Sequence, residues 1–274
     1  MNKALEGIKV LDVSRALAGP YCTMMLADMG AEVIKVEMPG TGDDSRGWGP
    51  PFIEGESAYF MSINRNKKSI TLDMKGDKAI EIIMKLIKGS DVLVENFRPG
   101  AMERLGLAYQ QVKPVNPRLV YCSISGFGQN GPYRMLPGFD QVLQGMGGLM
   151  SITGEAGGPP VKVGVPIADI TAGMFAAYGI AIALFTREKT GSGQMVDISL
   201  LDGQVALLTY RAGSFFASGE IPERIGSGHP VIVPYQAFKA KDVFINIAVG
   251  NDQLWGKFCK AVGLESIMND PRFA

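Results

Sequence analysis

The sequence has no net charge, because 27 lysine and arginine residues are balanced by 27 aspartate and glutamate residues. Without a charge excess, the chain has no global field that would attract nucleic acid or an anionic membrane, so we expect neither as a partner. Any anionic ligand must be held by local groups. The 274 residues are 46% hydrophobic and 20% charged, which predicts a globular protein with one large core or two.

Cysteine is scarce and occurs singly, at Cys22, Cys122 and Cys259. The absence of C-x-x-C spacing argues against a disulfide framework and against a zinc site, so we expect buried thiols and no metal. The first residues, MNKALEGIKVLDV, lack the apolar run of a signal peptide. Both observations fit a reducing compartment, and we predict a cytoplasmic protein.

Two nucleotide-binding motifs are also missing. No G-x-G-x-x-G follows the first β-rich run, and no glycine cluster matches G-x-x-x-x-G-K-[ST]. The sequence therefore gives no support to a nicotinamide-dependent enzyme or a nucleoside triphosphatase.

One uncharged run, over residues 170–186, reaches the lower length limit for a membrane span. It lies between Asp169 and Arg187 and contains several glycine and alanine residues. Small residues suit close helix packing in a protein core as well as they suit lipid. We interpret this run as a buried helix.

The N-terminal half alternates β-rich apolar runs with amphipathic segments. The runs cover residues 8–13, 31–37, 69–74, 91–97 and 119–128, and residues 75–89 repeat apolar positions with helical period. This alternation predicts an α/β fold with a Rossmann-like parallel sheet covered by helices.

A polar, glycine-rich segment at 219–230 precedes a predicted hairpin over 234–249 and a predicted helix over 252–264. We therefore expect a large domain over 1–205, a linker and glycine-rich loop over 206–230, and the beginning of a smaller α+β domain over 231–274. Too few residues follow the linker to close a second core, so we expect the native chain to continue.

Three segments resemble the class III CoA-transferases, the family that includes formyl-CoA and carnitine CoA-transferases. They are LDVSRALAGPYCTMMLADMGAEVIKVE (11–37), DVLVENFRPGAMERLGL (91–107) and VKVGVPIADITAGMFAAYGIAIALFTREKTGSGQMVDISLLD (161–202). The resemblance implies an interlocked homodimer that transfers CoA from an acyl-CoA to a free carboxylic acid. It implies CoA thioesters as substrates and no tightly bound cofactor.

The resemblance makes Asp169 the nucleophile, because it occupies the aspartate of the family segment P-x-A-D-x-x-[AS]-G. A carboxylate can exchange one acid for another by forming first a mixed anhydride and then an enzyme thioester. Asp169 could also simply cap the helix at 170–186. The two interpretations are compatible, since the positive end of the helix dipole would keep the carboxylate ionised.

The resemblance also implies a CoA site made from Ala16, Leu17, Ala18, Asn96, Phe97 and Arg104. Ala16 and Asn96 each follow a predicted strand, and ligands of parallel sheets collect at the carboxyl ends of strands. Arg104 either binds a CoA phosphate or is a solvated surface residue. Phe97 either stacks on adenine or fills the core.

Two positions depart from the formyl-CoA branch. Met38 replaces an arginine of the CoA site, for which Arg46, Lys67 or Lys68 could substitute. Leu17 replaces a glutamine that bonds intermediates, so we expect backbone donors to stabilise the anhydride here.

The related α-methylacyl-CoA racemases share the fold and use a histidine of a G-H-D triplet as a base. This chain has Gly138, Phe139 and Asp140 there, and phenylalanine cannot carry a proton, so the racemase alternative is disfavoured. Asp140 either contacts the bound acid or is a solvated turn residue. The only histidine, His229, is interpreted as a structural hydrogen-bonding residue.

A further alternative is a CoA-binding module without chemistry, against which the intact Asp169 segment argues. The segment GSGHPVIVPYQAF (226–238) favours small dicarboxylic acids, with succinyl-CoA as donor.

Overall fold

The computed structural model describes residues 3–273, which form two compact units. The first unit comprises the described residues up to Gly148 together with Gly164–Thr209. The second comprises Leu149–Val163 and the described residues from Tyr210 onward. The domain boundaries expected from the sequence stay predictions.

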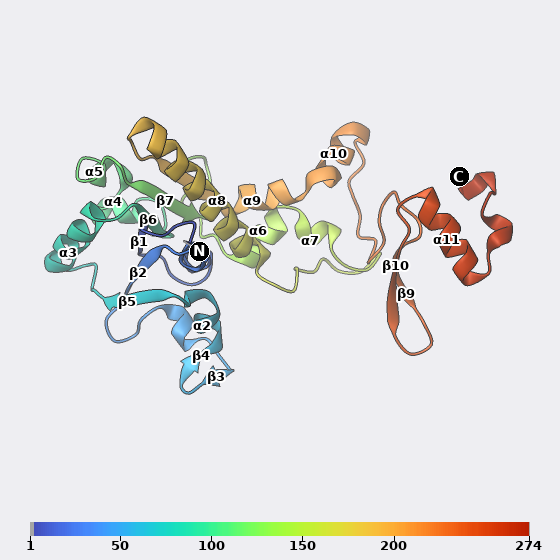
Figure 1. Ribbon diagram of the computed structural model, residues 1–274, viewed down its shortest axis with the longest axis horizontal. Coiled ribbons are helices and arrows are strands. Elements are labelled where there is room, and N and C mark those ends of the chain that lie inside the picture. The colour runs from blue at the N-terminus through green and yellow to red at the C-terminus, as the bar shows by residue number, and fades with distance from the viewer. Residues whose placement is uncertain (1–2, 274) are drawn as a thin grey trace. The chain divides into compact units, whose positions relative to one another are not determined.

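A six-stranded parallel sheet is the centre of the first unit, with the strand order β5-β2-β1-β6-β7-β8 (Figure 1). Numbered along the chain, this is the order 3-2-1-4-5-6 of Rossmann-like sheets. Every neighbouring pair is parallel, which confirms the predicted α/β fold class. The strands are β1 (Lys9–Asp12), β2 (Glu32–Glu37), β5 (Lys67–Thr71), β6 (Val92–Glu95), β7 (Val120–Ser125) and β8 (Met195–Ser199).

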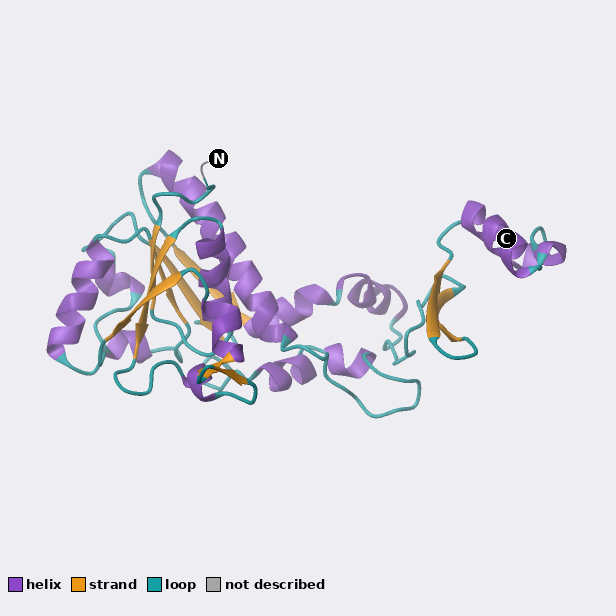
Figure 2. Cartoon of the chain, turned by 60° about the horizontal axis from the view of Figure 1, so that its bottom comes forward, coloured by secondary structure: helices purple, strands orange, loops and turns teal. Residues whose placement is uncertain are grey.

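Helices cover both faces of this sheet (Figure 2). On one face, α1 (Ala18–Asp28) and α8 (Ile167–Thr190) pack against Val10, Val94 and Cys122. The other face packs against α3 (Asp77–Lys88), α4 (Ala101–Arg104) and α5 (Tyr109–Val112). The central strand β6 is buried along its whole length, as expected for a parallel sheet covered on both sides.

Helix α8 is longer than the predicted run of 170–186. It begins directly after Pro166 and ends at Gly191, whose φ of 74° is left-handed. By length and composition it could cross a membrane, a test that the core helix of a soluble protein also passes. A Cβ on Gly173 would lie 2.7 Å from the Ala18 carbonyl oxygen, so glycine allows α8 to pack closely on α1.

The strand order reverses between β1 and β6, and the chain leaves both strands at the carboxyl edge of the sheet. There, the backbone N–H of Arg15 donates to Asn96 Oδ1 at 2.9 Å, and Asn96 Nδ2 donates to the Arg15 carbonyl at 2.7 Å. These two bonds tie the loops that follow the two strands. Ligands of open α/β sheets bind at this reversal point.

The remaining elements of the first unit are short. They are η1 (Asp44–Gly47), β3 (Phe52–Ile53), β4 (Glu56–Ser57), α2 (Ala58–Asn64), α6 (Asp140–Met146) and α9 (Leu200–Leu207). The β3–β4 pair is antiparallel.

The second unit contains the predicted hairpin, in which β9 (Tyr235–Lys239) pairs antiparallel with β10 (Phe244–Ala248). The predicted helix that follows is α11 (Asp252–Val262), which ends before Gly263 in the left-handed conformation. This region also contains α7 (Leu149–Ile152), α10 (Thr209–Ser218) and the short 3-10 helices η2 (Glu265–Ile267) and η3 (Pro271–Phe273).

Candidate active site

Asp169 lies in the first turn of α8, two residues after the helix begins. The interpretation that the Asp169 side chain caps this helix is wrong. The carboxylate of Asp140 performs that role, because its Oδ1 accepts the Ala168 N–H at 2.8 Å and the Asp169 N–H at 3.4 Å. Asp140 is thus a capping residue that also binds Gln144 Nε2 at 2.7 Å, and the alternative of a solvated turn residue is wrong.

The electrostatics of Asp169 differ from the sequence-based expectation. We expected the helix dipole to keep this carboxylate ionised, but burial, reinforced by the negative charge of Asp140, raises the pKa of Asp169 to about 7. The pKa of Tyr59 is raised to about 12 by burial and by Asp169, Asp140 and Asp43. Asp169 is therefore a carboxyl group that changes charge near neutral pH, as reactive carboxyl groups of enzymes do.

A cavity of about 400 Å³ contains Asp169 in its wall. The cavity brings together most of the residues predicted from the sequence: Ala16, Leu17, Ala18, Asn96, Phe97, Asp140 and Asp169. These residues come from the loops after β1 and β6 and from the first turns of α1, α6 and α8. Their functional roles stay predictions, while their convergence at one edge of the sheet is established.

Arg104 lies in the wall of a second cavity, of about 480 Å³, rather than in the first. The two cavities share Arg15, Asp44 and Phe97. The Arg15 guanidinium lies 5.4 Å from the centre of the Phe97 ring, in a cation–π contact. Phe97 is thus available to both cavities, and the choice between stacking and core filling stays open.

The cationic residues of this second cavity differ from the three that the sequence analysis suggested as replacements for the arginine missing at Met38. Arg46 is bound to Glu37, Lys67 is buried against Asp12, and Lys68 is paired with Glu32. None of the three lines either cavity, whereas Arg15 and Lys75 line the second one and Arg98 the first.

Sequence reasoning missed Lys75 and Arg98. Lys75 follows β5 at the carboxyl edge, so the rule that selected Ala16 and Asn96 would also have found it if applied to this strand. We had assigned residues 69–74 to a strand and 75–89 to a helix, but β5 ends at Thr71 and the helix begins at Asp77. The residues between them form part of the cavity wall.

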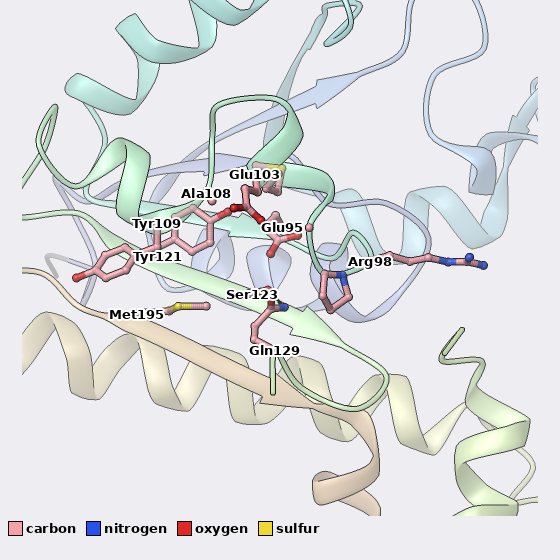
Figure 3. Close-up of a pocket in the computed structure, with 12 residues that line it drawn as sticks. Glu95, Arg98, Glu103, Ala108, Tyr109, Tyr121, Ser123, Gln129 and Met195 are labelled. Carbon is pink, nitrogen blue, oxygen red and sulfur yellow. Dashed lines mark hydrogen bonds between the residues drawn. The ribbon is translucent and has the colours of Figure 1, made fainter. Parts of the chain in front are cut away.

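A smaller cavity of about 100 Å³ lies on the side of the sheet that faces α4 and α5. Figure 3 shows Glu95, Tyr121 and Ser123 extending toward it from β6 and β7. Burial raises the pKa of Glu95 to about 7, although Ser123 and the Phe97 N–H, at 2.8 Å, both donate to its carboxyl group. Glu95 was also missed, although it is the only charged residue in the apolar run VLVENF.

His229 belongs to the second unit, where its ring lies between Tyr210 and Tyr235 at centroid distances of 5.8 and 5.3 Å. Its Nδ1 accepts the Val231 N–H at 3.3 Å, and its backbone N–H donates to the Tyr235 carbonyl at 3.0 Å. These bonds agree with the structural interpretation of this histidine. Phe139 directly precedes α6, and its side chain is 65% exposed.

The fold and the cavities define a Rossmann-like protein with a candidate ligand site at the carboxyl edge of its sheet and a partly buried, titratable carboxyl group in that site. The chain belongs to the family described as CoA-transferase family III, which matches residues 5–274. This confirms the family resemblance read from the sequence.

Relatives with assigned activities are similar over nearly the whole chain. Succinyl-CoA:glutarate CoA-transferase of Mus musculus is 45% identical over 99% of this chain, which spans 62% of that protein. Succinate–glutarate CoA-transferase of Agrobacterium fabrum is 45% identical over 98% of this chain and 69% of its own length. A CAIB/BAIF family protein from Brucella suis superposes with a TM-score of 0.90 at 44% identity, covering 100% of this chain and 73% of that one.

Proposed function

We propose that this chain carries the nucleophile and the CoA site of a CoA-transferase, which moves CoA from an acyl-CoA to a free carboxylic acid. The observation that carries the proposal is Asp169, a partly buried carboxyl group with a pKa raised to about 7. It lies in a cavity at the point where Rossmann-like sheets bind ligands. The activities of the mouse and Agrobacterium relatives support the same reaction class.

In the proposed mechanism, the ionised Asp169 attacks the thioester carbonyl of the donor, and CoA leaves as its thiolate. The resulting mixed anhydride is attacked by that thiolate at the Asp169 carbonyl, which releases the first acid and leaves an aspartyl-CoA thioester. The acceptor carboxylate attacks the Asp169 carbonyl carbon of this thioester, which expels the CoA thiolate and forms a second anhydride. The CoA thiolate then attacks the acceptor's acyl carbon, which yields the new acyl-CoA and regenerates Asp169.

The substrates that we propose are succinyl-CoA as the donor and a small dicarboxylic acid as the acceptor. The names of the mouse and Agrobacterium relatives, both of which specify succinate and glutarate, support this choice. Arg15 and Arg98 line the cavity of Asp169 and could each pair with a carboxylate that does not react.

The racemase alternative lacks its base at this site. Within the described residues 3–273, the wall of the cavity that contains Asp169 includes no histidine, and Phe139 stands in the position of the racemase base.

The test is to mix the protein with succinyl-CoA, trap with hydroxylamine or borohydride, and locate the modified residue by peptide mass spectrometry. We expect modification at Asp169, and we expect the CoA thioester of glutarate to form when glutarate is supplied. Asp169→Asn should bind CoA but form neither product, because it lacks the anionic oxygen. An unmodified Asp169 in a protein that still exchanges CoA would exclude the covalent mechanism.

We also propose a cytoplasmic homodimer. The outer side of α8 exposes Met174, Phe175, Tyr178, Ile182 and Phe185, and a row of exposed apolar side chains is typical of a protein interface. Light scattering at micromolar concentration should give twice the mass of the chain, and a monomer would refute the dimer.

A further inference from the structure

The backbone of the loop after β1 is strained at Ala16. Ala16 has a φ of 66°, in the left-handed region that residues other than glycine rarely adopt. Such a conformation is strained and persists only where surrounding groups hold it. Ala16 lines the same cavity as Asp169, so the strain lies within the candidate site.

Asp43 supplies the group that holds Ala16. Its Oδ1 accepts the Ala16 N–H at 3.2 Å, as well as the Ser45 N–H at 3.0 Å and the Ser45 hydroxyl at 2.8 Å. Its Oδ2 lies 2.8 Å from Lys35 Nζ, and the two side chains are 1% and 2% exposed. A buried carboxylate fixed from several sides can determine the position of a backbone N–H.

The residues before Ala16 are held in a similar way. Lys35 Nζ donates to the Ser14 carbonyl at 2.7 Å, and the Ser14 N–H donates to Asp12 Oδ1 at 2.9 Å. The backbone N–H and carbonyl of Arg15 both bind the Asn96 side chain. The backbone of residues 14–16 is therefore anchored by side chains from β1, from β2 and from the loops after β2 and β6.

The direction in which this loop leaves Ala16 determines where α1 begins. Leu17 and Ala18 follow at once and line the cavity of Asp169. The first turn of α1 contacts α8 at Gly173, one helical turn beyond Asp169. A change of backbone direction at Ala16 would therefore move the first turn of α1 relative to the carboxyl group.

We infer that Asp43 is a positioning residue of the site, and the inference rests on the proposed function. Its buried carboxylate holds Ala16 in the left-handed conformation and so places the first turn of α1 opposite Asp169. The Lys35 ammonium group, 2.8 Å from Asp43 Oδ2, helps to hold that carboxylate in place. Asp43 also belongs to the wall of the second cavity, but its side chain is only 1% exposed, so it acts through the Ala16 N–H rather than on a substrate.

Two double variants isolate this role. Both variants carry Lys35→Met, and they differ at position 43, where one has Asp43→Asn and the other Asp43→Leu. Each removes the buried pair of charges, a replacement that proteins often tolerate without loss of stability. Only asparagine retains an oxygen that accepts the Ala16 N–H. Because a misplacement of about 1 Å can cost on the order of 100-fold in rate, we expect the leucine variant to exchange CoA roughly 10- to 100-fold more slowly than the asparagine variant.

A third variant distinguishes the effect of the hydrogen bond between Asp43 and Ala16 from the effect of the bonds between Asp43 and Ser45. Glycine adopts positive φ without support, so adding Ala16→Gly to the leucine variant should restore part of the lost rate. If Asp43 acted only by binding Ser45 or by stabilising the fold in general, Ala16→Gly would restore none of the lost rate. Equal rates in the two double variants, or no recovery with glycine, would overturn the inference.

A crystal structure of the leucine variant gives a readout that does not depend on activity. We expect residue 16 to leave the left-handed region, and a retained positive φ would also overturn the inference. If the unaltered protein shows no exchange with any acid, the proposed function fails instead, and the conformation of residue 16 still decides whether Asp43 holds it.

Discussion

Asp12 is completely buried and Asp169 partly buried, both near the carboxyl edge of the sheet, and their protonation differs. Burial alone would raise the pKa of Asp12, but Lys67 and Lys35 and hydrogen bonds from Ser14 and Thr23 lower it to about 2. Asp169 has no such compensation, since the charge that acts on it is the negative Asp140, and its pKa is raised to about 7. One group is permanently ionised at neutral pH, whereas the other titrates there.

The difference indicates which carboxyl group is structural and which is available for chemistry. Lys67 Nζ lies 3.1 Å from Asp12 and also donates to the Pro20 carbonyl and to Asn64 Oδ1, so every partner of this ammonium group is internal. An uncompensated buried carboxyl group lowers stability at neutral pH, and active sites are where such groups occur most often. The contrast between the two regions predicts opposite responses to the same substitution.

Replacing Asp12 by asparagine should have the largest effect on stability. The substitution leaves the Lys67 ammonium, which is 2% exposed, without its counter-charge. Breaking a buried ion pair in this way costs about 3–5 kcal/mol, which chemical denaturation at pH 7 would measure. The control is Asp28→Asn, which breaks the more exposed pair with Arg65 and should cost less than about 1 kcal/mol. Equal costs for the two variants would remove the distinction between a buried and a surface pair.

Glu95→Gln should have the opposite sign, because Glu95 resembles Asp169 in being buried without a cation. The folded pKa of about 7 lies above the ordinary value of 4.5, so the folded protein binds the extra proton between these pH values and loses stability as the pH rises through them. A shift of this size corresponds to about 3 kcal/mol. We expect the variant to gain that much over the unaltered protein between pH 4.5 and pH 9, measured by urea denaturation. A gain that does not depend on pH would contradict the assignment.

The sequence was sufficient to predict the parallel sheet and part of the cavity wall. The five β-rich runs of the N-terminal half correspond to β1, β2, β5, β6 and β7. Because parallel strands all end at the same edge, Ala16 and Asn96 could be placed together. Segment ends were less accurate. The predicted run of 91–97 is a strand only over Val92–Glu95, because Asn96 turns to bind Arg15.

Long-range side-chain contacts were beyond sequence reasoning. Asp140 caps α8 by binding the Ala168 N–H, 28 positions further along the chain. This contact depends on how α6 packs, and no local sequence pattern encodes that packing. The raised pKa of Asp169 was missed for the same reason. The helix dipole is a local property that can be read from the sequence, whereas burial and a second carboxylate are tertiary properties that outweigh it.

Asp169→Asn should stabilise the folded protein above neutral pH. The folded pKa of about 7 lies above the ordinary 3.8, so stability is lost as the pH rises between these values, and asparagine removes the loss. Because Asp169 is partly exposed, we expect a gain of about 2 kcal/mol at pH 8, roughly half of the value of about 4 kcal/mol that the shift alone implies. Thermal denaturation at pH 4 and pH 8 would measure it. A destabilised variant at pH 8 would place Asp169 with Asp12 among the structural carboxyl groups.

The smallest effect concerns Asp140→Asn, which tests the second cause of the raised pKa of Asp169. Asparagine keeps an oxygen that can accept the Ala168 N–H, so the first turn of α8 should stay in place while the neighbouring charge is removed. The pKa of Asp169 should then fall but remain above its ordinary value, because burial, the larger cause, persists. If Asp169 is the proposed nucleophile, the rate at which succinyl-CoA modifies it should rise with pH as the carboxyl group ionises, and in the variant this rise should occur at lower pH. Asp44→Asn is the matched control, since Asp44 lines the same cavity but its side chain is 64% exposed and its charge is screened by water. A pH profile that is displaced equally by both variants would show that the general field of the cavity, rather than the adjacent Asp140, acts on Asp169.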